Sequence, residues 1–372
     1  MKARLGDYIQ EYSVRNKTDE EIPVYSVTNT QGFCRDYFGK EVASKDKSTY
    51  KIVPKGYFAY NPSRINVGSV DWQRDEDRVI VSPLYNVFSV SPRLEPQYLY
   101  YYLKSNIALH FIKAVATGSV RENLKFDMLC EFLINIPSVD EQRLIVQRLD
   151  KLQQLIQMHK KKLGKLDDLI KARFVEMFGE PRSNPFGYEK CMLKDTCKVV
   201  TGNTPSRAVD EYYGDFIEWI KTDNIVSGIT NPTTASECLS EEGMKVGRTV
   251  EENSILMACI AGSIASIGRV CITDRKVAFN QQINAIVPNK YNIYFLYVLL
   301  QISKDYLVEE INMALKGILS KSKLEEKEFI VPPMELQKRF ADFVAQVDKS
   351  KVVDINIILK GGVYNGNEFF VS

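Results

Sequence analysis

The sequence predicts an α+β protein built as a tandem duplication, in which two strand-rich α/β modules are each followed by a long helix. Three observations predict this fold. Short motifs recur in the same order along both halves of the chain, a heptad pattern of apolar residues runs through its middle, and a second apolar helical pattern follows the second half. We expect the two helices to pair as an antiparallel coiled coil.

The composition is that of a globular chain. The protein has 372 residues, of which 45% are hydrophobic, and 49 Lys and Arg oppose 47 Asp and Glu. At roughly 100–200 residues per domain, this length indicates two domains or one large one. A net charge of +2 means that any phosphate-binding surface must be a local patch. No segment approaches the roughly 18 apolar residues of a membrane-spanning helix, so we expect no membrane partner.

The seven cysteines and two histidines limit the disulfides, metal sites and catalytic mechanisms that the chain can have. An odd number of cysteines without a C-x-x-C motif is typical of reduced thiols in the cytoplasm, and the first residues lack the apolar region of a secretion signal. With His110 and His159 as the only imidazoles, histidine-based zinc sites and histidine-dependent catalysis are nearly excluded. We therefore expect a cytoplasmic protein without a metal.

Five short motifs recur at offsets between 188 and 200 residues, and their common order indicates a duplication. The pairs are Leu5-Gly6-Asp7 with Leu193-Lys194-Asp195, Gly68-Ser69-Val70 with Gly268-Arg269-Val270, Tyr85–Phe88 with Ile283–Ile286, Leu99–Leu103 with Leu296–Leu300, and Ile136-Pro137 with Val331-Pro332. The predicted parts are module 1 (residues 1–136), a central helix segment (137–181), module 2 (182–331) and a distal helix segment (332–372).

Both modules show short apolar or alternating segments bounded by turn residues, which predict strands at residues 22–27, 78–81 and 255–260. A helix is predicted late in each module, at residues 96–106 and 294–302.

The central helix is predicted over residues 139–178, a span without proline. Ser138 and Glu141 have the spacing of a capping box at its start, and Gly179 followed by Pro181 is a typical stop. The heptad seam steps by alternating three and four residues through Ile145, Leu149, Leu152, Ile156, His159, Leu163, Leu166, Ile170, Arg173 and Met177.

A second long helix is predicted after Pro333, over residues 334–360, because Gly361 and Gly362 disfavour helix by about 1 kcal/mol each relative to alanine. His159, on the central seam, is interpreted as a polar residue that sets the pairing register. The residues predicted to pair the helices or bind a partner are Leu149, Leu152, Ile156, Leu163, Leu166, Ile170, Phe340, Val344 and Val347.

Polar loops within the modules supply the candidate binding residues. Their Arg, Lys, Asn, Gln, Ser and Thr side chains suit recognition of base edges and phosphates in DNA, although ordinary polar turns have the same composition. The candidate DNA-binding residues are Lys55, Tyr60, Asn61, Ser63, Arg64, Asn66 and Arg121 in module 1, and Asn203, Thr204, Arg207, Lys221, Thr222, Asn224, Ser263, Ser266, Gln281 and Gln282 in module 2.

Signatures of catalysis are mostly absent from the sequence. It contains no phosphate-binding loop, no dinucleotide fingerprint and no nucleophile elbow. Asn61-Pro62-Ser63-Arg64 is only superficially similar to the N-P-P-aromatic motif of amino-methyltransferases, since it lacks the second proline and the aromatic ring. We therefore predict a protein without catalytic residues or cofactor.

Taken in order, the motifs resemble the specificity subunit of type I restriction-modification systems. The resemblance covers nearly the whole chain and rests on the duplicated plan together with Ile136-Pro137-Ser138, Glu141-Gln142-Arg143, Val331-Pro332-Pro333, Glu335, Gln337, Gly202–Ser206, Tyr213-Gly214, Trp219–Thr222 and Asn280-Gln281. It implies that each module is a target-recognition domain for one half of a bipartite DNA site, and that the paired helices set the gap between the halves.

The same resemblance implies partners that perform the chemistry. Two modification subunits would bind the helices and modules, carry S-adenosylmethionine and flip the target adenine. Restriction subunits would join to translocate and cleave DNA, so that Mg and ATP also belong to partner subunits.

Two other interpretations remain open from the sequence. The chain could be a coiled-coil scaffold whose modules bind protein partners, or an inactive, rearranged specificity subunit, because the shortened second helix departs from the family pattern. A self-sufficient methyltransferase would need an S-adenosylmethionine site, and no such motif is found.

Overall fold

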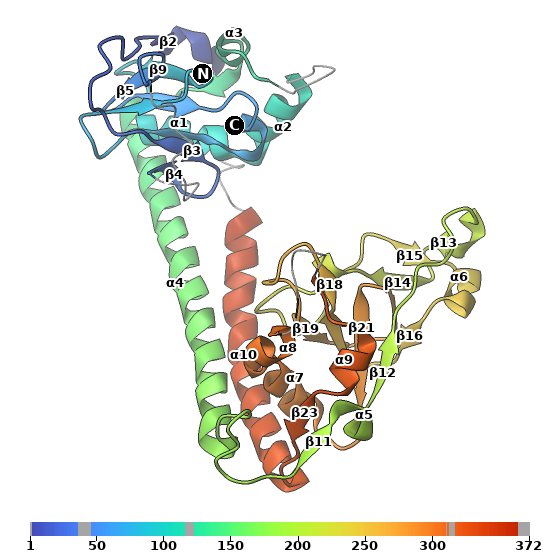
Figure 1. Cartoon of the computed structure of the whole chain (residues 1–372). Coiled ribbons are helices and arrows are strands. Elements are labelled where there is room, and N and C mark those ends of the chain that lie inside the picture. The colour runs from blue at the N-terminus through green and yellow to red at the C-terminus, as the bar shows by residue number, and fades with distance from the viewer. Residues whose placement is uncertain (1, 36–45, 116–122, 310, 312–316, 364–372) are drawn as a thin grey trace. The chain divides into compact units, whose positions relative to one another are not determined.

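The computed structural model describes residues 2–35, 46–115, 123–309, 311 and 317–363 (Figure 1). The chain divides into two compact units, unit 1 (Met1–Met158 with Asn356–Ser372) and unit 2 (His159–Ile355). Unit 1 holds module 1 and the first part of the central helix. Unit 2 holds module 2, the rest of that helix and most of the distal helix, and each unit is described by itself.

Module 1 is built around a four-stranded antiparallel sheet. Its strands lie in the order β2 (Ile9–Glu11), β9 (Asn86–Val90), β6 (Phe58–Tyr60) and β7 (Val70–Trp72). Three two-stranded pairs join β1 (Lys2–Arg4) with β10 (Leu133–Asn135), β3 (Ser26–Thr28) with β4 (Gly32–Cys34), and β5 (Lys51–Pro54) with β8 (Arg78–Val81). The helices are η1 (Leu5–Asp7), η2 (Ile65–Val67), α1 (Pro96–Lys104), α2 (Asn106–Val115) and α3 (Phe126–Cys130).

Module 2 contains a matching sheet with the strand order β12 (Cys197–Thr201), β21 (Ile283–Pro288), β17 (Ile255–Ala258) and β19 (Val270–Ile272). A second sheet has the order β13 (Tyr213–Gly214), β15 (Cys238–Leu239), β14 (Ile217–Ile220), β20 (Val277–Phe279) and β16 (Thr249–Val250), in which β14 and β20 are parallel. Two further pairs join β11 (Lys190–Met192) with β23 (Glu328–Ile330), and β18 (Ile260–Ala261) with β22 (Gly317–Ile318).

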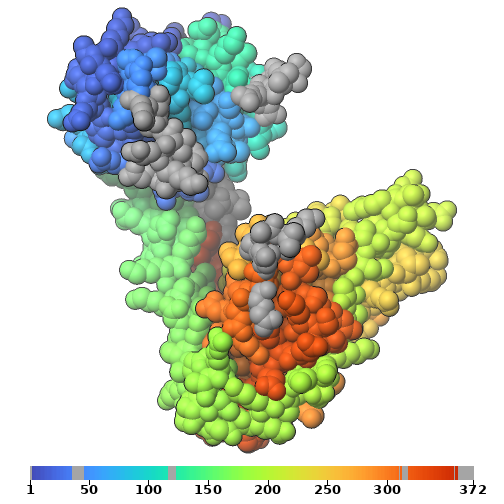
Figure 2. All heavy atoms as spheres, viewed as in Figure 1, coloured from blue at the N-terminus to red at the C-terminus, as the bar shows by residue number. Residues whose placement is uncertain are grey.

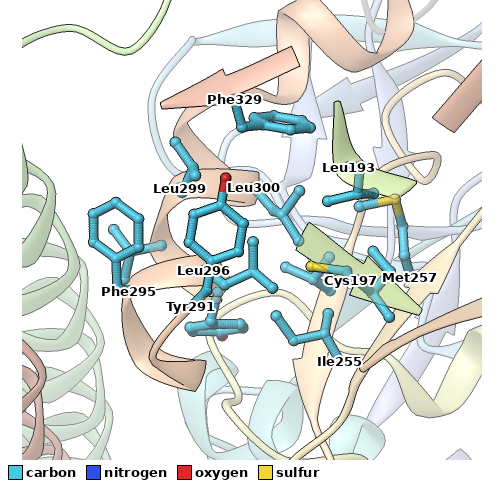
Figure 3. Close-up of a cluster of buried hydrophobic side chains, with 14 of the residues drawn as sticks. Leu193, Cys197, Ile255, Met257, Tyr291, Phe295, Leu296, Leu299, Leu300 and Phe329 are labelled. Carbon is cyan, nitrogen blue, oxygen red and sulfur yellow. The ribbon is translucent and has the colours of Figure 1, made fainter. Parts of the chain in front are cut away.

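The helices of module 2 are short except for one. They are α5 (Leu193–Thr196), η3 (Asp210–Tyr212), η4 (Thr222–Asn224), α6 (Glu241–Val246), α7 (Ile293–Ile302), α8 (Lys304–Val308) and α9 (Lys321–Glu325). The longest, α7, carries Phe295, Leu296, Leu299 and Leu300 into the main core. There they meet Leu193, Ile255 and Phe329 from other elements (Figure 3).

The two modules repeat one topology, which confirms the predicted duplication. Strands β2, β9, β6 and β7 of module 1 have the same order and directions as β12, β21, β17 and β19 of module 2. In each module the first strand pairs with the last, as β1 does with β10 and β11 does with β23. The repeated motifs therefore lie at equivalent places in two copies of one fold.

A buried glutamine near the start of each long helix repeats as well. The Gln142 side chain accepts a hydrogen bond from the Glu95 backbone N–H at 2.8 Å and donates to the Pro137 carbonyl at 2.9 Å. The Gln337 side chain does the same with the Asn292 backbone N–H at 2.9 Å and the Pro332 carbonyl at 2.8 Å. Each glutamine thus ties the long helix to the start of its own module's aromatic helix, α1 or α7.

The central helix, α4 (Val139–Phe178), has the predicted bounds. At its start, the Glu141 carboxylate accepts a hydrogen bond from the Ser138 backbone N–H at 2.9 Å, and the Ser138 hydroxyl accepts one from the Glu141 N–H at 3.3 Å. At its end, Gly179 has φ = 76°, a left-handed conformation that glycine adopts readily. The predicted capping box and stop are both confirmed.

Within unit 2, α4 lies beside α10 (Met334–Val363) and runs antiparallel to it. The rings of Phe174 and Phe340 are 5.4 Å apart, and Lys351 Nζ lies 2.7 Å from the Asp167 carboxylate. The second contact lies nearer the N-terminus of α4 than the first and nearer the C-terminus of α10. The two helices therefore run in opposite directions, and this part of the predicted antiparallel pairing is confirmed.

Four predicted elements differ from those observed. The strand predicted at residues 255–260 is divided into β17 and β18, which belong to different sheets. The distal helix continues through Gly361 and Gly362 to residue 363, because a cost of about 1 kcal/mol per glycine does not by itself stop backbone hydrogen bonding. The helix predicted over residues 96–106 breaks at Ser105, whose extended backbone (ψ = 153°) separates α1 from α2. The strand predicted at residues 22–27 is only β3, since Pro23 lacks the N–H of a regular ladder.

Among the described residues, no helix combines the length and the apolar character needed to cross a membrane.

Candidate nucleic-acid interface

In module 2, polar loops from distant parts of the sequence meet on the region built by β12, β14 and β16. The parts around β13, β15 and α6 lie on the side of module 2 away from α10, and Figure 2 shows them as a yellow-green and yellow lobe. The predicted loops at residues 201–207, 219–224 and 280–282 are joined there by hydrogen bonds. The structure therefore brings together most of the candidate residues of this module.

Gly202 allows the first loop to lie directly on the third. Its backbone N–H donates to the Ile283 carbonyl at 3.0 Å. A Cβ at this position would overlap the carbonyl oxygens of Phe279 and Asn280, so only glycine permits this approach without a shift of the backbone.

The next residues of the loop are held by their own side chains. The Asn203 amide donates to the Val246 carbonyl at 2.9 Å and accepts from the Arg248 backbone N–H at 2.7 Å. The Thr204 hydroxyl, which is exposed, donates to the side-chain oxygen of Gln281. The Asn203 side chain therefore makes its hydrogen bonds within the module, whereas Thr204 and Gln281 lie at the surface.

Arg207 and Lys221 form a cationic pair over two aromatic rings. The Arg207 guanidinium lies 4.3 Å from the centroid of Tyr213 and 5.1 Å from that of Trp219, and Lys221 Nζ lies 5.1 Å from the Trp219 centroid. Both cations also contact the Glu237 carboxylate, at 2.7 Å and 2.9 Å. Hydrogen bonds from Lys221 and Arg207 hold the pKa of the Glu237 carboxyl below its usual value, so this carboxylate is charged at neutral pH.

The loops around Thr222 and Ser266 are connected by one arginine. Arg269 donates from Nε to the Ser266 carbonyl at 3.2 Å and from Nη2 to the Thr222 carbonyl at 3.3 Å. The Ser266 and Ser263 hydroxyls lie 3.0 Å apart, with Ser263 exposed. Arg269 therefore joins the predicted loop 262–266 to the rest of this surface.

Asn224 is not available as a surface donor. Its side chain is 7% exposed, accepts from the Lys221 backbone N–H at 2.9 Å and donates to the Thr234 carbonyl at 3.1 Å. Asn224, which the sequence analysis predicts to bind DNA, uses its amide groups to hold the turn of η4. Gln282 lies beside this surface, half-buried, and accepts a hydrogen bond from the Asn280 side chain at 3.2 Å.

In module 1, Tyr60 is likewise buried. The side chain is fully buried in β6, and its hydroxyl donates to the Leu124 carbonyl at 3.1 Å and accepts from Asn86 at 2.8 Å. Burial raises the pKa of the Tyr60 hydroxyl, which is consistent with a core role. Tyr60, which the sequence analysis predicts to bind DNA, therefore belongs to the core of module 1.

The other candidates of module 1 fall into two separate groups. Lys55 precedes β6 and is exposed, with Nζ 3.5 Å from the Asp75 carbonyl. Asn61, Ser63 and Arg64 follow β6, and the Ser63 hydroxyl donates to Asn123 at 2.7 Å. Asn66 is half-buried in η2, and Arg121 lies outside the described residues. The continuous polar run in the sequence is therefore divided by a buried strand.

The predicted helix residues differ in burial. Phe340, Val344, Val347 and Ile170 belong to the core that α4, α10 and module 2 share within unit 2, and Leu166 packs against this core. Leu149 instead belongs to the core of module 1. Leu152 and Leu163 are half-buried and Ile156 is 6% exposed.

Sequence reasoning missed Glu237, which no predicted loop contains. It lies next to β15, 16 residues after Lys221 and 30 after Arg207, so no local spacing could connect it with them. Arg269 was seen only as part of a repeated motif. In the part of the chain that the structure describes, no group of three or more His, Cys, Asp or Glu side chains is arranged to hold a metal ion.

Comparison with known proteins gives a family for this fold. The sequence matches the profile described as "Type I restriction modification DNA specificity domain" over residues 6–167 and again over residues 185–357. The chain belongs to this family. Each match covers one module and most of the helix that follows it, so the resemblance seen in the motifs is confirmed, as is the predicted α+β fold with two helix-terminated modules.

Two curated relatives are similar to this chain over part of their length. The chain is 28% identical over 275 residues to the type I restriction enzyme MjaIX specificity subunit of Methanocaldococcus jannaschii, covering 67% of this chain and 61% of that protein. It is 30% identical over 119 residues to the HindI specificity subunit of Haemophilus influenzae, covering 32% of this chain and 25% of that protein. The chain thus spans less than two thirds of the length of these relatives.

A solved structure supports the fold. The chain is similar to one from work on complex assembly and conformational transition of the type I R-M system, with a TM-score of 0.54 at 16% identity, over 98% of this chain and 93% of that chain. At this identity the likeness concerns the fold alone.

Proposed function

We propose that this chain is the DNA-recognition subunit of a type I restriction-modification complex, in which each module binds one half of a bipartite DNA site. The observation that carries the proposal is the repeated topology: two copies of one fold, each followed by a long helix, in a chain of the DNA specificity family. Two equivalent surfaces on one chain suit a site with two halves.

The chemistry of the module 2 surface supports DNA as the ligand. Arg207 and Lys221 present two cations on an aromatic platform, and Thr204, Gln281 and Ser263 add exposed hydrogen-bonding groups around them. Arginine can pair with guanine in the major groove, glutamine with adenine, and lysine with phosphates. In module 1, Arg64 and Ser63 supply the corresponding exposed groups.

The partners follow from the same proposal. Two modification subunits bind the helices and modules and carry S-adenosylmethionine, and restriction subunits join them with Mg and ATP. This chain then contributes recognition and performs no catalytic step. A complex that acts on cellular DNA would lie in the cytoplasm. Thiols stay reduced there, which agrees with the seven free cysteines of this chain.

Methylation-site sequencing of a host that carries this gene with its partner subunits tests the proposal. We expect methylated adenines in one bipartite sequence, absent from a host that lacks this gene alone. A methylome that does not change on deletion of this gene contradicts the proposal.

Binding of random duplex DNA at several salt concentrations separates recognition of DNA from a protein scaffold. Binding through phosphates weakens steeply as salt rises, with a slope of about 0.9 per phosphate contact on logarithmic axes. A scaffold for proteins shows little binding at any salt concentration.

A further inference from the structure

The seam of α10 changes from apolar to charged at its C-terminal part. Core-facing positions recur at steps of four and three residues, first with three apolar side chains and then with two charged ones. They are Phe340, Val344, Val347, Lys351 and Asp354. Lys351 is 8% exposed and Asp354 is fully buried, so both charges need partners within the protein.

Those partners lie on α4. Lys351 Nζ is 2.7 Å from the Asp167 carboxylate and 3.0 Å from that of Asp348 on its own helix. Asp354 Oδ1 is 2.6 Å from His159 Nδ1 and 3.2 Å from Lys162 Nζ. His159 is itself a position of the α4 seam, so charged or polar side chains meet at the centre of the helix pair.

A slide of α10 by one heptad would separate Asp354 from its partners. In one direction Asp354 would move from His159 to Leu166, and in the other to Leu152. A carboxylate without a partner in an apolar seam is strongly disfavoured.

The same slide would separate Lys351 from Asp167. In one direction Lys351 would face Phe174, and in the other it would face Lys160. Phenylalanine cannot neutralise a buried ammonium group, and a second lysine repels it. Val344, which lies near Ile170, would still meet an apolar residue after such a slide, Leu163 in one direction and Met177 in the other, so it discriminates against the slide less.

We propose that Lys351 and Asp354, with Asp167 and His159, set the pairing register of α4 and α10 and thereby the gap between the two half-sites. The link between this register and the gap rests on the proposed function. Because α10 is tied to module 2 through Gln337, its position along α4 fixes the position of module 2 along that helix. A slip of one heptad would move it by about 10 Å, or about three base pairs.

Cysteine cross-linking in the full chain measures the register without DNA. Ile170 and Val344 belong to the same buried cluster and line the same cavity, whereas a one-heptad slip would bring Val344 to Leu163. We expect Ile170→Cys with Val344→Cys to cross-link in the native chain, and Leu163→Cys with Val344→Cys to give only background.

The decisive variant combines His159→Leu, Lys351→Leu and Asp354→Leu, which makes the seam apolar and leaves the remaining charged groups at partly exposed positions. We expect the Leu163→Cys, Val344→Cys pair to cross-link in this variant at about tenfold above background. If the cross-link stays at background while the variant folds, the proposed role in setting the register is wrong.

A charge-swapped variant is the matched control. Lys351→Asp with Asp167→Lys exchanges the two charges across the seam and keeps the ion pair, so we expect only the native cross-link. Lys351→Asp alone places acidic groups together and should lower the native cross-link. If the swapped variant does not recover it, the charges do not set the register, even if the triple variant fails to fold.

The consequence for DNA is tested with duplexes that carry the mapped half-sites at gaps up to about three base pairs shorter or longer. We expect the native and charge-swapped complexes to methylate one gap, and the triple variant to accept a second. A register change without a change of gap preference would overturn the link to specificity. A native complex that methylates no duplex would refute the proposed function, while the cross-links still decide the register.

Discussion

Arg207 and Lys221 are held in place before any ligand arrives, because aromatic rings and one shared carboxylate fix both cations. A side chain that is already ordered loses less conformational entropy on binding than a free one. Glu237 also lowers the net charge of this surface, so that any anionic ligand of the two cations must compete with it. Such competition favours ligands whose groups match the geometry and not merely the charge.

Single cations on the proposed surfaces give the first prediction. We expect Lys221→Ala and Arg64→Ala each to weaken binding of the specific DNA site, by about 1–3 kcal/mol where the lost contact is bidentate to a base. Titration of labelled duplex with the assembled complex measures the change. Lys194→Ala, which removes one charge from an exposed position in α5, should bind like the native chain. Equal affinity of all three variants would show that the DNA surface is elsewhere.

At this scale the sequence shows which residue types are present but not where they point. Arg64, Thr204 and Gln281, which are candidate DNA-binding residues, are exposed. Tyr60 appears in the same polar run, yet every residue of β6 is buried because both faces of this strand are covered. Glu237 was missed because its partners are distant in sequence and meet it only in the folded module.

At the scale of elements, Gln142 and Gln337 link each long helix to its module. Both are nearly fully buried, and each accepts a hydrogen bond from the backbone N–H of the residue that precedes α1 or α7. The repeated pattern means that each helix leaves its module by the same local geometry.

The glutamine contacts give the second prediction. We expect Gln142→Ala and Gln337→Ala each to lower the free energy of unfolding by about 1–3 kcal/mol, since each leaves buried backbone groups without a partner. Chemical denaturation measures the loss. Gln147→Ala, at an exposed position of α4, is the control and should change stability little. Losses of equal size in the control and the buried variants would contradict this account.

The seam gives the third prediction. Ile170 is 5% exposed and belongs to the core of unit 2, whereas its neighbour Leu169 is 48% exposed. We expect Ile170→Asp to destabilise the chain by about 3–5 kcal/mol, because it places an unpaired charge in an apolar interface, and Leu169→Asp to be tolerated. Thermal unfolding of the two variants decides between them, and similar midpoints would mean that this face of α4 is not a seam.

The long elements were predicted well because their signals are local. A capping box, a heptad repeat, the absence of proline and a terminal glycine all lie within α4 or at its ends. The break between α1 and α2 is different, because the Ser105 hydroxyl donates to the Tyr102 carbonyl and accepts from the Ala108 N–H. Serine also occurs within continuous helices, so the residue type alone does not predict this break.

At the scale of the whole molecule, duplication is the feature from which the proposed function follows. The same four-strand order appears twice, and each copy ends in a long helix. The sequence predicted this arrangement because five motifs kept their order, although each alone was too short to be informative. The extra sheet of module 2, from β13 to β16, has no counterpart among the repeated motifs and could not be predicted from them.

A longer central helix gives the fourth prediction. One heptad inserted into α4, with a matching heptad in α10, adds about 10 Å of helix, which corresponds to about three base pairs of DNA. We expect the complex with this chain to methylate the same two half-sites at a wider gap. Full activity at the original gap only would show that the helices do not set the spacing.

The most direct test of the claim that the two modules recognise their half-sites independently is methylation-site sequencing of a chimera. In this chain residues 1–136 are replaced with the equivalent module of another family member, and the partner subunits are kept. We predict that one half of the recognised site changes, while the other half and the gap between them stay as in the native chain. A chimera whose two half-sites both change, or whose gap changes, would contradict the account.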